Sequence, residues 1–210
     1  MSTIAIMGTG LMASALGKGW TKAGHQVQIG SRSPEAVQSA DLGYEPAVVG
    51  DYRTALAGSD TVVLAIPFTA VVPFVEEHQE ALAGKTIIDI SNPFDALPGN
   101  ELAGAEYTAK ALGTTDGLVA AFKDNFAATV NAPGAADGNR PDVKIAGDDD
   151  EAKAVVAALA ADLNHRVLDC GPLHNARLID SMVSLMLILD RTYTGFTMKT
   201  GWRFTGLTEN

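Results

Sequence analysis

Gly8-Thr9-Gly10-Leu11-Met12-Ala13 lies between a short apolar run and a helical pattern near the start of the chain. In this G-x-G-x-x-A turn, Gly8 permits a tight turn and Gly10 lets the backbone approach a pyrophosphate, while the small Ala13 lets the helix pack close to the sheet. The helix start adds free N–H groups and the positive end of the helix dipole. A strand, this turn and a helix in that order predict a dinucleotide-binding unit. The alternative is a structural glycine turn in an unrelated α/β fold.

Apolar runs alternate with helical patterns along the rest of the first half. Short apolar runs bounded by glycine or proline predict buried strands. Strands separated by helices of this length form parallel βαβ units, so we expect an α/β fold with a Rossmann-type doubly wound parallel sheet. Ser33-Pro34-Glu35 is expected to open the second helix. The other expected helices are 11–23, 51–57 and 71–82, and the expected strands are 4–7, 27–29, 47–49, 61–66, 85–90 and 118–122.

The end of the second expected strand indicates which dinucleotide binds. An NAD site places an acidic side chain there, against the ribose 2′-hydroxyl. This chain has Gly30-Ser31-Arg32-Ser33 instead. A guanidinium and two hydroxyls can bind a 2′-phosphate, which an acid would repel. We therefore predict NADP(H) rather than NAD(H). The alternative is that Arg32 is a solvated loop residue and Ser33 only caps a helix.

The composition changes at Asn131–Asp142, where glycine, proline and alanine leave no apolar periodicity. We interpret this segment as a surface loop between two units. Residues 1–130 are then the NADP-binding Rossmann domain, and residues 131–210 are a small C-terminal α/β domain on the substrate side with dimer contacts. The second unit is expected to contain strands at 143–146 and 166–169 and helices at 151–163 and about 174–190.

Composition excludes several classes of function. Lysine and arginine number 15 against 25 aspartates and glutamates, a net charge of −10. Such a surface repels phosphate backbones and anionic lipid, so neither nucleic acid nor a membrane surface is an expected partner. A single cysteine, Cys170, excludes an internal disulfide and fits a reducing compartment. With no secretory signal pattern and no apolar run of the ~20 residues that span a bilayer, we expect a soluble, cytoplasmic protein.

No metal site is expected from the sequence. The four histidines are scattered, and no Cys/His cluster is present. Asp148–Asp150 resembles an acidic metal-binding run, but three acids before a helix suit its N-cap and its dipole better. Cys170 is expected to be a small buried apolar residue, and His174 to have a capping or surface role.

The chain resembles the F420-dependent NADP oxidoreductase family over nearly its whole length. The similarity includes the opening GTGLMASALGKGWTKAGHQVQIGSRS, the strand end Ile66-Pro67-Phe68, and the stretches Ala146–Glu151 and Asp169–Leu178. The resemblance implies a Rossmann domain with a small C-terminal domain, a homodimer, and hydride transfer between NADP(H) and the deazaflavin coenzyme F420.

The resemblance also implies a set of cofactor-binding residues. The family's phosphate contacts correspond here to Thr9, Gly10, Leu11 and Met12, and its 2′-phosphate contacts to Ser31 and Arg32, beside Gly8 and Ser33 of the same two turns. Its nicotinamide contacts correspond to Ile66, Pro67, Phe68, Val72 and Ala127. Ordinary core packing is the alternative role for Phe68 and Val72. Direct hydride transfer requires two rings held at the right distance rather than a general base, so no catalytic side chain is predicted.

Two segments depart from the family pattern. Ala121–Phe126 lacks the histidine and proline of the best-known archaeal members, and the C-terminal tail is poorly matched. These departures leave the electron acceptor open. One alternative is an NADPH-dependent reductase of a free flavin, a quinone, or a small carbonyl or imine. The other is a non-catalytic NADP(H)-binding domain, like the cytoplasmic half of some membrane metalloreductases.

The helical segment Met182–Leu189 is apolar on nearly all faces. Such a helix must be buried all round, either within this chain or against a partner. It supports the expectation of a homodimer.

Overall fold

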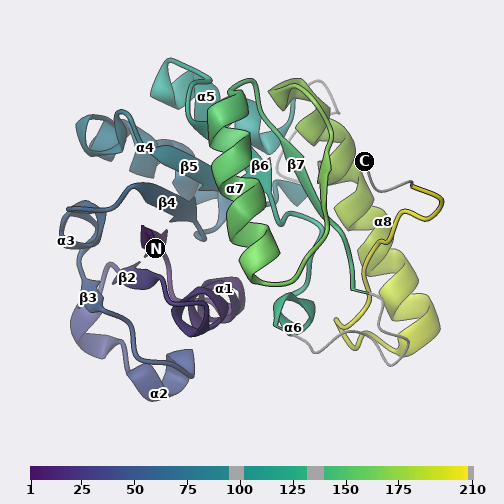
Figure 1. The fold of residues 1–210 in the computed structure, drawn as a ribbon, viewed down its shortest axis with the longest axis horizontal. Helices are drawn as coiled ribbons and strands as arrows, with labels where there is room; N and C mark the ends of the chain where they lie inside the picture. The colour runs from purple at the N-terminus through teal and green to yellow at the C-terminus, as the bar shows by residue number, and fades with distance from the viewer. Residues whose placement is uncertain (95–101, 132–139, 208–210) are drawn as a thin grey trace.

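The computed structural model describes residues 1–94, 102–131 and 140–207. Most of the loop expected at 131–142 therefore lies outside the described residues. One sheet runs through the molecule, with its strands in the order β3-β2-β1-β4-β5-β6-β7-β8 (Figure 1). The expected α/β, Rossmann-type class is confirmed.

The strands are short, and the central ones are buried on both faces, which explains their continuous apolar sequences. In β1, Ile6 is opposite Ile29 of β2 and Val63 of β4 in parallel register. The strand bounds are β1 Thr3–Met7, β2 Gln26–Gly30, β3 Val48–Gly50, β4 Thr61–Leu64, β5 Thr86–Asp89, β6 Leu118–Ala121, β7 Val143–Ala146 and β8 Val167–Asp169.

Helices cover both faces of the sheet, as a doubly wound fold requires. One apolar cluster joins the sheet to α1 (Leu11–Lys22), α2 (Ser39–Leu42), α6 (Ala127–Val130) and α7 (Asp150–Asp162), and Figure 1 shows α7 in front of the strands. A second cluster on the opposite face joins the sheet to α3 (Tyr52–Leu56), α4 (Phe68–Leu82), α5 (Gly104–Leu112) and α8 (Ala176–Thr194).

The strands of the C-terminal part continue the same sheet. β7 pairs antiparallel with β6, with Ala121 opposite Ile145, and β8 then pairs parallel with β7. Because β7 is reversed, its first residue lies at the edge where the parallel strands end. The strands expected after residue 142 are confirmed, whereas the division into domains at residue 130 stays a prediction.

Two expected helices differ in the structure, and one helix was not expected. Ser33 does not open an α-helix: Pro34–Ala36 form a single 3-10 turn, after which Val37 returns to an extended conformation. The Ser33 side chain makes no capping hydrogen bond there. α4 begins at Phe68, so Pro73 lies inside the helix rather than in its first turn. α5 was not expected at all.

Helix α8 is buried along one face within this chain, and burial of its other side against a partner stays a prediction. Ile179, Val183 and Met186 face the core. Leu178, Leu185 and Ile188 are 63%, 47% and 61% exposed. No helix among the described residues is long and apolar enough to cross a membrane.

The C-terminal tail folds back along α8 and is held by two buried aspartates. Asp190 accepts hydrogen bonds from Met198 N (2.9 Å) and Thr200 Oγ1 (2.9 Å). Asp142, just before β7, accepts one from Phe204 N at 2.6 Å. Arg166 also binds both carboxylate oxygens of Asp142 at 2.8 Å. The tail is thereby fixed beside the start of β7.

Acid should release this end of the tail. Burial opposes the charged form of Asp142, but the Arg166 and Phe204 hydrogen bonds outweigh it and lower the pKa of the carboxyl. Because the folded-state pKa is depressed, this stabilisation is present above the ordinary aspartate pKa and is lost as pH falls through the lowered value. We expect Trp202 fluorescence to change on acidification before global unfolding. In Asp142→Asn the change should be present already at neutral pH, and an unchanged acid titration in that variant would contradict the assignment.

Candidate functional site

The first glycine of the turn has a backbone that other residues rarely adopt. Gly8 has φ +118°, and its N–H donates to Gly30 O at 2.9 Å. A Cβ at this position would lie 2.4 Å from Ala65 O. The turn therefore brings the ends of β1, β2 and β4 together, and it requires glycine.

The second glycine opens towards solvent instead. Gly10 is the N-cap of α1 and carries no side chain to cap the helix. A Cβ built on it meets no atom within 4 Å. The first turn of α1 contains no acidic residue. Free N–H groups, a positive helix end and open space above them fit a pyrophosphate.

A cleft of about 1280 Å³ runs over this turn at the carboxyl ends of β1, β2 and β4. It is in this position that doubly wound sheets bind dinucleotides. The structure brings ten of the predicted binding residues to its walls: Gly8, Thr9, Gly10, Leu11, Met12, Ser31, Arg32, Ser33, Ile66 and Pro67.

The far end of the cleft is shaped for an anion. Ser31 Oγ accepts a hydrogen bond from Ser33 N at 3.1 Å, which closes a small turn around Arg32. Arg32 and Ser33 are exposed. Across the described residues, no carboxylate lies within ion-pair distance of Arg32, so its guanidinium is available to a ligand.

Three predicted residues do not line this cleft. Phe68, at the start of α4, packs edge-on against Tyr107 of α5, with ring centroids 6.1 Å apart. Val72 is half-buried in α4. Ala127 borders a separate depression beside α1, with Ser14 and Lys18. Their roles at the nicotinamide stay predictions.

The sequence reasoning missed several walls of the cleft. These residues come from the segment after β2, from the start of α3 and from the N-terminal half of α4, and they include Val37, Asp41, Tyr52, Pro73 and Phe74. On this side of the cleft, only Ile66 and Pro67 at the end of β4 were predicted from the sequence. Tyr52 and Phe74 become neighbours only through the packing of α3 against α4, with ring centroids 5.0 Å apart.

The acidic run before α7 caps the helix, as expected. Asp149 is the N-cap, and its Oδ1 accepts hydrogen bonds from Glu151 N (2.9 Å) and Ala152 N (3.0 Å). Within the described ranges, no group of His, Cys, Asp or Glu residues could hold a metal ion. Cys170 is half-buried, and burial raises the pKa of its thiol.

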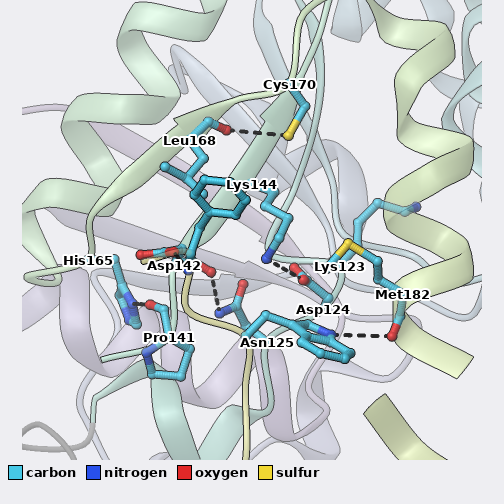
Figure 2. Close-up of polar contacts among 12 residues, drawn as sticks. Lys123, Asp124, Asn125, Pro141, Asp142, Lys144, His165, Leu168, Cys170 and Met182 are labelled. Carbon is cyan, nitrogen blue, oxygen red and sulfur yellow. Dashed lines mark hydrogen bonds and ion pairs between the residues drawn. The ribbon is translucent and has the colours of Figure 1, made fainter. Parts of the chain in front are cut away.

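The segment Ala121–Phe126, which departs from the family pattern, contains buried charged side chains. Lys123 and Asp124 follow β6 and are 2% and 1% exposed. Lys144 of β7 reaches Asp124 Oδ2 at 2.7 Å, as Figure 2 shows. From the sequence we saw only that this segment differs from relatives. Its ion pairs could not be predicted, because the partners lie on other elements.

Comparison with known proteins identifies the relatives of this chain. Residues 3–93 match the family model of NADP oxidoreductases, coenzyme F420-dependent. The F420-dependent NADP reductase of Methanocaldococcus jannaschii is 28% identical over 206 residues, which cover 87% of this chain and 89% of that protein. The chain is a relative of the F420-dependent NADP reductases. The resemblance drawn from the sequence is confirmed.

Two further comparisons extend the relationship. A solved structure from Arthrobacter sp. FB24, described as a candidate F420-dependent NADP reductase, superposes with a TM-score of 0.84 and 27% identity, covering 98% of this chain and all of that one. The rat metalloreductase STEAP3 is 31% identical over 180 residues, which cover 85% of this chain but 36% of that protein. The relatives of this chain thus include the reductases over almost their full length and one part of a larger metalloreductase.

Proposed function

We propose that this protein transfers a hydride between NADP(H) and the deazaflavin coenzyme F420. The observation that carries the proposal is the cleft: a glycine turn and a free helix start at one end, and an exposed arginine between two serines at the other. Reductases named for both molecules match the chain over most of its length. The hydride itself is supplied by the nicotinamide ring, so the protein contributes binding, orientation and exclusion of water.

Each part of the cleft has a separate role in this proposal. The N–H groups at the start of α1 bind the pyrophosphate, and Gly10 leaves room for it. Ser31, Arg32 and Ser33 bind the 2′-phosphate. Ile66 and Pro67 turn the chain over the end of β4 and direct the nicotinamide towards the carboxyl ends of β5 and β6.

Replacing Arg32 should weaken the binding of NADPH but not that of NADH. We expect Arg32→Ala to weaken NADPH binding tens-fold, about 2 kcal/mol, because a charge-assisted hydrogen bond to the 2′-phosphate is lost. NADH binding should hardly change. Fluorescence titration with both cofactors measures the two affinities. Arg53→Ala, at an exposed position of α3 outside the cleft, is the matched control. Equal losses for NADPH and NADH would contradict the assignment.

The acceptor is tested by stopped-flow measurement of NADPH oxidation, with purified coenzyme F420 and free FMN offered in parallel. We expect rapid oxidation with the deazaflavin and little with FMN. Activity with FMN alone would instead support a free-flavin reductase. Tight NADPH binding without turnover of either acceptor would support a non-catalytic NADP(H)-binding domain.

We further propose a cytoplasmic homodimer. The exposed apolar side chains Leu178, Leu185 and Ile188 follow one side of α8 and form what we call the α8 strip. A second copy of the chain would cover the strip and remove its apolar surface from water. The cytoplasmic location and the absence of nucleic-acid partners stay predictions from the single cysteine and the net charge of −10.

A charge on the α8 strip should separate the protomers. Leu185→Glu with Ile188→Glu is expected to give a monomeric mass by light scattering at micromolar concentration, where the unmodified protein is dimeric. Val155→Glu, at a 39% exposed apolar position of α7, is the control and should leave the mass unchanged. A monomeric unmodified protein would refute the dimer.

A further inference from the structure

One face of α4 forms a wall of the cleft. Successive turns of this helix present residues to the space at a spacing of four positions, which keeps side chains on the same side of a helix with 3.6 residues per turn. The residues are Thr69, Ala70, Pro73, Phe74 and Glu77. The wall therefore extends from the end of β4 to Glu77.

Tyr52, at the start of α3, joins this wall to the turn that carries Arg32. A Cβ on Gly30 would be 3.0 Å from the Tyr52 ring, so the ring lies directly against that turn. The same ring meets Phe74 of α4 edge to face, with centroids 5.0 Å apart. A single aromatic ring thus links the proposed 2′-phosphate site to the middle of α4.

The cleft has a firm and largely apolar wall here. His78 is 6% exposed and packs against this wall, with its ring centroid 4.7 Å from that of Phe74 and 5.9 Å from that of Tyr52. Pro73 is exposed, and its side chain has no polar atom. Apolar and aromatic surfaces of this kind stack against planar heterocycles. We call this part of the cleft the far wall, which consists of Tyr52, Pro73, Phe74 and Glu77.

Glu77 adds a carboxylate to the far wall. Its side chain is exposed and forms no ion pair within the described ranges. The same is true of Arg32, so the two charges do not neutralise each other in the empty cleft. An ionised carboxylate only accepts hydrogen bonds. The far end of the cleft thus offers a cation for a phosphate and, past one aromatic ring, an acceptor for a hydrogen-bond donor.

These features fit the adenosine half of NADP(H). The 2′-phosphate and the adenine are attached to the same ribose, so a phosphate on Arg32 brings the base to the neighbouring far wall. Adenine has a flat face for stacking and a 6-amino group that donates hydrogen bonds. We propose that the far wall binds the adenine and that Glu77 accepts a hydrogen bond from its 6-amino group. This inference rests on the proposed binding of NADP(H), and it adds a selection for 6-aminopurines over 6-oxopurines.

Asp41 of α2 is a second carboxylate on the cleft. Its neighbour Leu42 packs in the apolar cluster of α1, so Asp41 lies on the side of the helix assigned to the pyrophosphate. The contacts of Tyr52 instead join the Arg32 turn to α4. The base is therefore assigned to Glu77, and Asp41→Asn serves as the variant for the opposite wall.

Binding of a deaminated cofactor tests this assignment. In deamino-NADPH a hypoxanthine replaces the adenine, so a 6-oxo group that only accepts hydrogen bonds faces the carboxylate. We expect the unmodified protein to bind NADPH about tenfold more tightly than deamino-NADPH, because a hydrogen bond to a charged acceptor is lost. Fluorescence titration measures both affinities and needs no electron acceptor.

Two neighbouring glutamates of α4 provide the variant and its control. Glu77→Gln should reduce the preference to about twofold or less, because the amide can accept from the 6-amino group and can donate to the 6-oxo group. Glu76→Gln makes the same change at an exposed position outside the cleft and should retain the full preference.

The outcomes separate this inference from the proposed function. Equal affinities of the unmodified protein for NADPH and deamino-NADPH would overturn the assignment. A preference that persists in Glu77→Gln, or that is lost in Asp41→Asn alone, would overturn it as well. A protein that prefers NADPH to deamino-NADPH but reduces no deazaflavin would contradict the proposed function while supporting this inference. A protein that binds neither cofactor would refute both.

Discussion

Gly8→Ala is expected to destabilise the fold by at least about 2 kcal/mol. The substitution would force an alanine to φ +118° and place its Cβ 2.4 Å from Ala65 O. Neither strain can be relieved by a side-chain rotation, because the obstructing atom belongs to the backbone of the segment after β4. The ends of β1 and β4 would have to separate. Urea denaturation of the variant measures the loss.

Gly10→Ala is the matched control, two residues along the same turn. Gly10 has φ −75°, which alanine adopts without strain, and its Cβ would meet no atom. We expect a stability close to that of the unmodified protein, and weaker binding of NADPH because the methyl group occupies the space assigned to the pyrophosphate. A stable Gly10→Ala that binds NADPH normally would show that the phosphates lie elsewhere.

Lys144→Met is expected to cost about 3 kcal/mol of folding free energy. The substitution leaves Asp124 1% exposed and without its ammonium partner at 2.7 Å. Burial already raises the pKa of Asp124 while Lys144 opposes that rise. Without the lysine, the folded state keeps a proton that the unfolded state releases, so stability falls further as pH rises. The penalty measured by urea denaturation should be larger at mildly alkaline than at mildly acidic pH.

The double variant Asp124→Asn with Lys144→Met provides the control. Removing both charges eliminates the unpaired carboxylate, so most of the lost stability should return and its pH dependence should disappear. A double variant as unstable as Lys144→Met would mean that the methionine is poorly packed and that the charge is irrelevant.

The parts that could be predicted from the sequence depend on local chemistry. The turn from Gly8 to Ala13 needs only its own glycines and the helix that follows. The segment from Ser31 to Ser33 likewise carries its donors within three residues. The buried strands were recognisable because each is a continuous apolar run in a sheet covered on both faces. The fold class follows from these features alone.

Other parts depend on contacts between distant segments. Asp180 meets Lys123 and Gly104 only when α5 and α8 pack on the same face of the sheet. α5 is short and begins at Gly104, which gave no helix signal. Ser33-Pro34-Glu35 had the pattern of a helix start, but Val37 turns extended, so local propensity failed there. The structure of the tail could not be predicted, because Asp142, which accepts a hydrogen bond from Phe204, lies far from it in the sequence, and Asp190 accepts hydrogen bonds from the tail only once the chain has folded back along α8.

The two outermost strands, β3 and β8, limit how copies of this protein can meet. Each is only three residues long, β3 ends in Gly50, and β8 ends in the charged Asp169. Short edge strands that end in glycine or a charged residue are poor templates for backbone pairing with another molecule. An open sheet of eight strands is thus protected from growing into a fibril by continuation of its ladder. The dimer proposed above would therefore depend on side chains of α8 rather than on backbone pairing between strands.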